Sequence, residues 1–141
     1  MDFATIKRVW LPLILGLFAL RYMFRFAPGP PGLMRSVGLV VALIGLAGVI
    51  VARYTLGRSF SIVPKATALV TTGIYSRIRN PIYVSGMFFV AGLVLMMRRP
   101  ALLAIFLVLI PMQIIRARRE AAVLEANFGD AYREYRKRTW F

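Results

Sequence analysis

The residues best suited to chemistry in this sequence lie close together near the middle of the chain. Arg79 carries a guanidinium, which can hold a carboxylate through two parallel hydrogen bonds. Asn80 followed by Pro81 is typical of a helix N-cap and first turn, where free backbone N–H groups favour an anion. Tyr75 and Tyr83 add a phenol ring on either side. The same residues would also suit a capped helix at a membrane interface, so the local pattern leaves both interpretations open.

Glu120 is a second candidate. Four of the five acidic residues lie in the C-terminal tail, and Glu120 is the one closest to the apolar part of the chain. Its carboxylate could act on a ligand, or it could simply form an ion pair with Arg79, Arg118 or Arg119. These two alternatives are equally compatible with the sequence.

The tail itself is expected to be helical, because apolar residues recur in it at steps of three or four. They are Ala121, Leu124, Phe128, Ala131 or Tyr132, and Tyr135. The run Phe128-Gly129-Asp130 predicts a break between two short helices. Most of this segment also fits a basic amphipathic helix that lies on the anionic inner leaflet.

The composition indicates a membrane protein. The chain has 141 residues, which predicts one domain, and 60% of them are hydrophobic, which excludes a disordered chain. Lys and Arg outnumber Asp and Glu by 19 to 5, but they are interleaved with apolar runs, so nucleic acid is not an expected partner. There is no His and no Cys, which excludes an imidazole base and a thiolate nucleophile, and we expect no metal site.

Four apolar stretches predict an all-α protein with about four transmembrane helices and a cytoplasmic amphipathic tail. A spanning helix needs roughly 20 apolar residues, with a lower limit near 17. The last two stretches are short, and we interpret them as a tight helical hairpin that turns at Arg98, Arg99 and Pro100. The stretches cover residues 9–26, 37–56, 81–97 and 101–115.

The basic residues predict an orientation. With four passes, 14 of the 19 Lys and Arg residues share one side with the N-terminus, the loop before the third helix and the tail. Only Arg25, Arg35, Arg98 and Arg99 lie on the other side, and Arg21 lies within the first helix, where its side chain can reach the interface. The positive-inside rule therefore places the loop 57–80 and the tail in the cytoplasm, in a membrane that we expect to be the bacterial inner membrane.

Small residues four positions apart in the second stretch predict close helix packing. The pairs are Gly38 with Ala42 and Gly48 with Ala52. Packing within the bundle is the favoured interpretation, and dimerisation through the same surface is the alternative.

Two motifs resemble a known family. Gly73-Ile-Tyr75-Ser-Arg-Ile-Arg79-Asn80-Pro81-Ile-Tyr83, followed by Gly86, is similar to the signature G-x-Y-x-x-x-R-[HN]-P-x-Y-x-x-G of the isoprenylcysteine carboxyl methyltransferases. Related phospholipid N-methyltransferases share this signature. The tail, from Glu120 through Phe128-Gly129 to Tyr132 and Tyr135, resembles the second family block, an acid-rich stretch before F-G-x-x-Y-x-x-Y. Together the two blocks cover about residues 60–138.

The resemblance implies an integral membrane methyltransferase that uses S-adenosylmethionine, bound on the cytoplasmic side. It implies one domain, 1–141, with an N-terminal helix pair at 1–56 and a cofactor-binding catalytic part at 57–141. It assigns catalytic roles to Arg79, Asn80 and Glu120. It assigns cofactor binding to Gly73, Tyr75, Arg79, Asn80, Pro81, Tyr83, Gly86 and Glu120. Many members carry His where this chain has Asn80, and an amide cannot titrate near neutral pH.

The chemistry of the cofactor matches these residue types. Arg79 could hold the carboxylate of S-adenosylmethionine, the tyrosines its adenine or sulfonium, and Glu120 its ammonium or ribose hydroxyls. The acceptor is expected to be a lipid or another lipophilic molecule in the bilayer. An anionic carboxylate needs no base, whereas an ammonium must first lose a proton, so carboxyl methylation is favoured over phospholipid amine methylation. An NADPH-dependent membrane reductase and a non-catalytic membrane protein are the remaining alternatives, and the sequence does not fix the oligomeric state.

Overall fold

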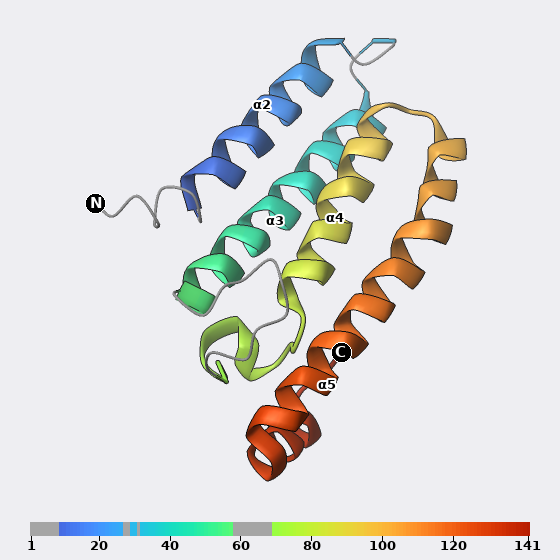
Figure 1. The fold of residues 1–141 in the computed structure, drawn as a ribbon. Helices are drawn as coiled ribbons and strands as arrows, with labels where there is room; N and C mark the ends of the chain where they lie inside the picture. The colour runs from blue at the N-terminus through green and yellow to red at the C-terminus, as the bar shows by residue number, and fades with distance from the viewer. Residues whose placement is uncertain (1–8, 27–28, 31, 58–68) are drawn as a thin grey trace.

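The computed structural model describes residues 9–26, 29–30, 32–57 and 69–141. In this part of the chain the regular elements are helices, joined by turns and irregular segments, and Ile78 and Trp140 form one isolated bridge. Four of the expected cations, Lys7, Arg8, Arg58 and Lys65, lie outside the described residues. The elements in chain order are α2 Leu11–Phe26, α3 Leu33–Leu56, η3 Gly73–Ser76, α4 Pro81–Met96, η4 Pro100–Ile105 and α5 Phe106–Arg138 (Figure 1).

Helices α3 and α4 form the centre of the bundle, with α2 on one side and α5 on the other (Figure 1). Their contact depends on glycine. A Cβ atom added to Gly38 would lie 2.7 Å from the carbonyl oxygen of Gly92, and one added to Gly92 would lie 2.6 Å from the Cα of Ala42. Gly45 meets the backbone of α4 in the same way. The prediction that small residues pack within the bundle is confirmed for this surface.

The chain between α4 and α5 turns tightly, as the sequence predicts. Helix α4 ends at Met96, and Arg98 adopts a positive φ of 54° before η4 begins at Pro100. Helix α5 continues past the end of the apolar stretch at residue 115 into the tail, which was expected to be helical. Only Gly129, with φ 48° and ψ −120°, departs from helical geometry, which confirms the predicted break at that residue.

Two helical segments have the length and composition to cross a membrane, Leu33–Leu56 and the run Ala101–Arg138. Helices α2 and α4 have 16 residues each, so at 1.5 Å per residue each is about 24 Å long. A typical hydrocarbon core is about 30 Å thick. Two of the four predicted spans are therefore supported by length and composition.

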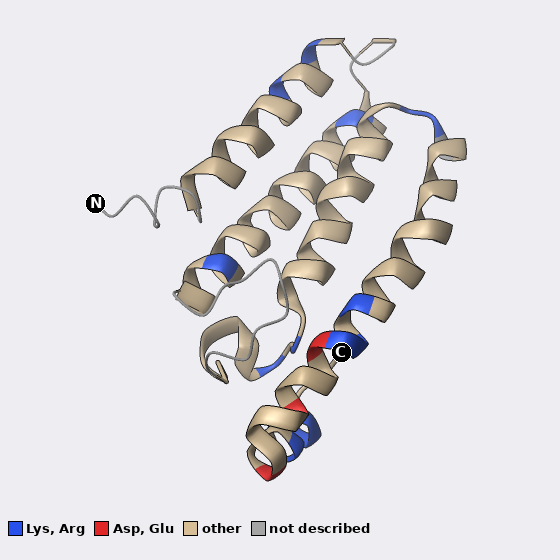
Figure 2. Cartoon of the chain, in the orientation of Figure 1, with Lys and Arg blue, Asp and Glu red and all other residues tan. Residues whose placement is uncertain are grey.

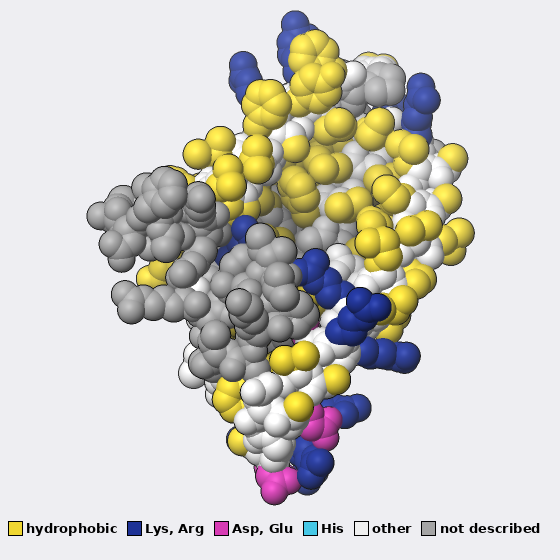
Figure 3. All heavy atoms as spheres, in the orientation of Figure 1, with side chains coloured by type: hydrophobic (Ala, Val, Ile, Leu, Met, Phe, Trp, Pro, Cys, Tyr) yellow, Lys and Arg dark blue, Asp and Glu magenta, His cyan; other side chains and the backbone are white. Residues whose placement is uncertain are grey.

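The outer surface of the bundle is apolar. Phe18 on α2 is 67% exposed and Leu107 on α5 is 79% exposed, and both would be costly to leave in water. Figure 3 shows apolar side chains over the upper part of this face. In Figure 2 the Lys and Arg residues lie near the ends of α2, α3 and α4 and from the middle of α5 downwards, and the acidic residues that the structure describes lie in the lower part of α5. This arrangement supports association with a membrane, and the orientation across it remains a prediction.

Candidate functional site

The loop before α4 is held against the end of α3 by a glycine. Gly73 has a φ of 58°, which is left-handed backbone, and a Cβ there would lie 3.0 Å from the Cγ2 of Thr55. The following turn buries Tyr75, whose exposed fraction is 7%. Burial raises the pKa of the Tyr75 phenol, and the Tyr135 hydroxyl and the Glu120 carboxylate raise it further. The phenol therefore stays neutral and can donate a hydrogen bond at any physiological pH.

The end of the tail folds back onto this loop after the break at Gly129. The hydroxyl of Tyr135 donates a hydrogen bond of 2.7 Å to the carbonyl oxygen of Tyr75. The N–H of Trp140 donates to the carbonyl oxygen of Arg77 at 2.8 Å, next to the parallel bridge between Ile78 and Trp140. The loop and the tail, 60 residues apart in sequence, thus form one unit at this end of the molecule.

The start of α4 is built as the sequence predicts, with one difference. Asn80 is the N-cap residue and Pro81 the first helical residue, although the Asn80 side chain makes no capping hydrogen bond. We expected free N–H groups here for an anion. This expectation is wrong for Arg79 and Asn80, because their N–H groups donate to carbonyl oxygens of Trp140 and Phe141. Pro81 has no N–H, and the N–H of Tyr83 donates to Asn80.

Tyr83, Glu120 and Arg116 form a polar cluster between α4 and α5. The Tyr83 hydroxyl donates a short hydrogen bond to Glu120 Oε1. Arg116 Nε lies 3.7 Å from the same oxygen, and its guanidinium carbon lies 5.6 Å from the centre of the Tyr83 ring. Side-chain exposure is 28% for Glu120 and 47% for Arg116, so the cluster is partly shielded from solvent.

The ion-pair partner of Glu120 differs from the three that we expected. The structure pairs Glu120 with Arg116, one helical turn earlier, and not with Arg79, Arg118 or Arg119. Arg116 is a site residue that the sequence motifs did not indicate. Its spacing of four from Glu120 was the available signal, because residues four apart share one face of a helix.

Arg79 is linked to the tail through its backbone and its charge. Its N–H donates hydrogen bonds to the carbonyl oxygens of Trp140 and Phe141. Its positive charge counteracts the rise in pKa that burial causes at the hydroxyls of Tyr132 and Tyr135. Both tyrosines are buried, with exposed fractions of 3% and 5%. Arg79 precedes α4 in the chain and Glu120 belongs to α5, so these two candidate site residues come from different segments.

Gly86 differs from the packing glycines of the bundle. A Cβ added there would meet no atom within 4 Å, whereas the glycines of the α3–α4 contact leave no such space. Gly86 lies one turn after Tyr83 on α4, so the open space adjoins the polar cluster. Glycine weakens a helix by about 1 kcal/mol relative to alanine, and helix packing does not explain it at this position.

These residues fit S-adenosylmethionine by chemistry. The cofactor has a carboxylate that suits Arg79, an ammonium that suits Glu120, and a nucleoside that needs open space beside a backbone such as that of Gly86. Gly73, Tyr75, Asn80 and Pro81 build the loop and the helix start between these groups.

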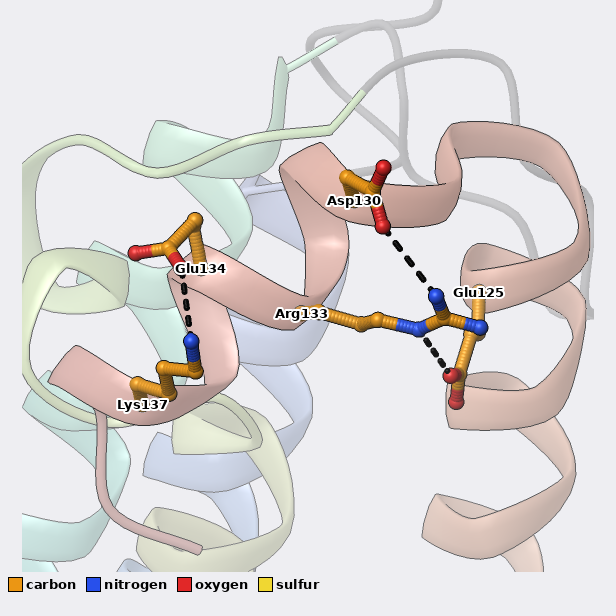
Figure 4. Close-up of polar contacts among 5 residues, drawn as sticks. All are labelled: Glu125, Asp130, Arg133, Glu134 and Lys137. Atoms are coloured by element: carbon orange, nitrogen blue, oxygen red, sulfur yellow. Dashed lines mark hydrogen bonds and ion pairs between the residues drawn. The ribbon is translucent and has the colours of Figure 1, made fainter.

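The other three acidic residues of the tail form exposed ion pairs outside this site. Figure 4 shows Arg133 between Glu125 and Asp130, on the two sides of the break at Gly129, at distances of 2.9 and 3.1 Å. Lys137 pairs with Glu134 at 2.8 Å. Exposed pairs of this kind contribute little to stability, and these acids serve as controls for Glu120.

We expect Tyr135→Phe to destabilise the protein by about 1–3 kcal/mol, because the carbonyl of buried Tyr75 would lose its hydrogen bond from the tail. Tyr54→Phe is the matched control, since Tyr54 is 73% exposed on α3. Thermal unfolding of both variants in one detergent measures the difference. Equal melting temperatures for the two variants would show that this bond does not hold the tail.

A comparison with known families gives one match. A family model described as phospholipid methyltransferase matches residues 33–131, which include α3, α4 and α5 as far as the break. None of the curated proteins matches the chain. The matched range contains both the Tyr83–Glu120–Arg116 cluster and Gly86.

Proposed function

This chain belongs to the phospholipid methyltransferase family, and from that premise we propose that it transfers a methyl group from S-adenosylmethionine to a lipophilic acceptor in the membrane. The observation that carries the proposal is the junction of α4 and α5. There Tyr83 and Glu120 are hydrogen-bonded beside the open space at Gly86, within the range that the family matches. The exposed apolar surface of the bundle supports an acceptor that arrives through the bilayer.

The cofactor, when bound, supplies an electrophilic methyl group on a sulfonium. In this proposal Arg79 binds its carboxylate and Glu120 its ammonium. The Tyr83 hydroxyl fixes the Glu120 carboxylate, and Gly86 leaves room for the nucleoside. Methyl transfer needs alignment of donor and acceptor more than proton transfer, and positioning of this kind supplies roughly 7–11 kcal/mol of a barrier.

A carboxylate is the acceptor that we propose first. It is already anionic, whereas an amine needs a base, and the carboxylate of Glu120 is engaged by Tyr83 and Arg116. Asn80 cannot supply a base either, because an amide does not titrate near neutral pH. A phospholipid amine is the second candidate, favoured by the description of the matching family.

The two acceptors give products that are easily told apart. Purified protein is incubated with S-adenosylmethionine labelled in the methyl group and with a membrane extract. A label that is released by mild base indicates a methyl ester, and a base-stable label in the phospholipid fraction indicates N-methylation. Label in the phospholipid fraction alone would overturn the carboxylate proposal.

Cofactor binding is tested separately by calorimetry on detergent-purified protein, with S-adenosylmethionine and its demethylated product as ligands. NADPH is the control, because it would bind if the chain were a reductase. Saturable binding of the methyl donor supports the proposal. Binding of NADPH alone would overturn it, and a folded protein that binds neither ligand would favour a non-catalytic role.

Arg79→Ala is expected to weaken binding of S-adenosylmethionine by about 10- to 150-fold, because a charge-assisted pair contributes about 1.5–3 kcal/mol. Arg79→Lys should recover only part of this, since an ammonium lacks the guanidinium fork. Arg99→Ala, at the opposite end, is the control. Arg35 is unsuitable as a control because its side chain is buried and donates to Gly29. Equal affinities for Arg79→Ala and Arg99→Ala would refute this role of Arg79.

A further inference from the structure

A groove between α2 and α3 lies at the end of the bundle opposite the candidate site. It has a volume of about 360 Å³. Its apolar lining comes from Leu17, Leu20 and Phe24 of α2 and Leu39 and Leu43 of α3, and its polar lining from Arg21 and Arg25. The two arginines are one helical turn apart, so both guanidiniums lie along the same wall.

The groove faces the surroundings of the protein rather than its core. Leu17, Phe24 and Leu43 are each between 43% and 50% exposed, although all three are apolar. Around a membrane helix such a surface is covered by acyl chains. The arginines lie towards the end of α2, where the polar headgroups of the bilayer begin.

The charge of the groove selects among headgroups. The sequence has no acidic residue between positions 3 and 119, and in Figure 2 the acidic residues lie at the far end of α5. The field at this end is therefore positive. A guanidinium binds phosphate oxygens through paired hydrogen bonds, and two of them beside an apolar groove match a phosphate that carries acyl chains.

We propose that this groove binds one anionic phospholipid of the bilayer, with its phosphate on Arg21 and Arg25 and an acyl chain along Leu17, Leu39 and Leu43. This lipid site is separate from the candidate methyl-transfer site and does not depend on the proposed function. The lipid bound here is a resident of the protein surface, and it is not the methyl acceptor.

Native mass spectrometry of the purified full chain tests the proposal. The probes are phosphatidylglycerol and phosphatidylcholine with identical acyl chains. We expect one phosphatidylglycerol to bind at least tenfold more tightly than phosphatidylcholine. The double variant Arg21→Ala/Arg25→Ala should lose this preference, whereas Arg99→Ala, with one charge removed at the same end, should retain it.

Two further experiments distinguish the contribution of the phosphate to binding from that of the acyl chain. Leu43→Trp should lower the affinity for both lipids by filling the groove. A melting temperature equal to that of the wild type is the check that this variant is folded. Glycerol 3-phosphate, which has no acyl chain, should not displace the lipid. The proposal is overturned by equal binding of the two lipids, by an unchanged preference in the double variant, or by displacement with glycerol 3-phosphate.

Discussion

Glu120→Ala is expected to weaken binding of S-adenosylmethionine by about 10- to 150-fold, the loss of one charge-assisted hydrogen bond of about 1.5–3 kcal/mol. The carboxylate of Glu120 is fixed by the Tyr83 hydroxyl from α4 and by Arg116 from its own helix, so its orientation is set before a ligand arrives. An ammonium bound to it therefore loses little additional freedom. Removal of the carboxylate also leaves the positive charge of Arg116 beside the ammonium of the cofactor.

The chain offers close controls for this substitution. Glu125→Ala and Glu134→Ala remove the same charge from the same helix, but both carboxylates form exposed ion pairs away from α4. Calorimetry should show near wild-type affinity for these two variants. Tyr83→Phe should have a smaller effect than Glu120→Ala, because the carboxylate remains but is less well oriented. If Glu125→Ala weakened binding as much as Glu120→Ala, the assignment of the ammonium to Glu120 would fail.

Patterns within a single segment predicted much of the fold. Asn80 and Pro81 marked the start of α4, Arg98 to Pro100 marked the turn of the hairpin, and Gly129 marked the break in the tail. Each of these features depends on the backbone preferences of one or two residues, and such preferences follow from the residue types alone. The apolar stretch that ends at residue 115 and the tail that was expected to be helical form one helix, α5, as far as the kink at Gly129. Helix α5 changes from apolar to charged after residue 115, but nothing in the backbone preferences of Arg116 to Glu120 ends a helix.

Contacts between distant segments were harder to predict from the sequence. The motif residues of the loop and the tail were both recognised, yet the sequence did not predict that Tyr135 bonds to Tyr75 or that Trp140 pairs beside Ile78. Such pairings depend on the direction in which the chain leaves Gly129, and composition does not encode that direction. They also explain why the N–H groups of Arg79 and Asn80 are occupied where an anion site was expected.

Gly86→Leu and Gly92→Leu are expected to have opposite effects, although they place the same side chain in the same helix. At Gly92 the new Cβ would lie 2.5 Å from the Gly38 carbonyl oxygen and 2.6 Å from the Cα of Ala42. Both are backbone groups of α3, which cannot rotate aside, so α3 and α4 must separate. Overpacking typically costs about 1–3 kcal/mol, and rigid backbone contacts place this variant at or above the upper end. We expect a large fall in melting temperature or no folded protein.

At Gly86 the new Cβ would meet no atom within 4 Å, and replacement of glycine within a helix gains up to about 1 kcal/mol. Gly86→Leu should therefore fold at least as well as the wild type. If the space beside Gly86 holds the nucleoside of S-adenosylmethionine, the same variant should lose cofactor binding by more than 100-fold, and Gly86→Ala by less. Melting temperature and calorimetry on one preparation separate the two effects. A stable Gly86→Leu variant with wild-type affinity would place the nucleoside elsewhere and leave the glycine unexplained.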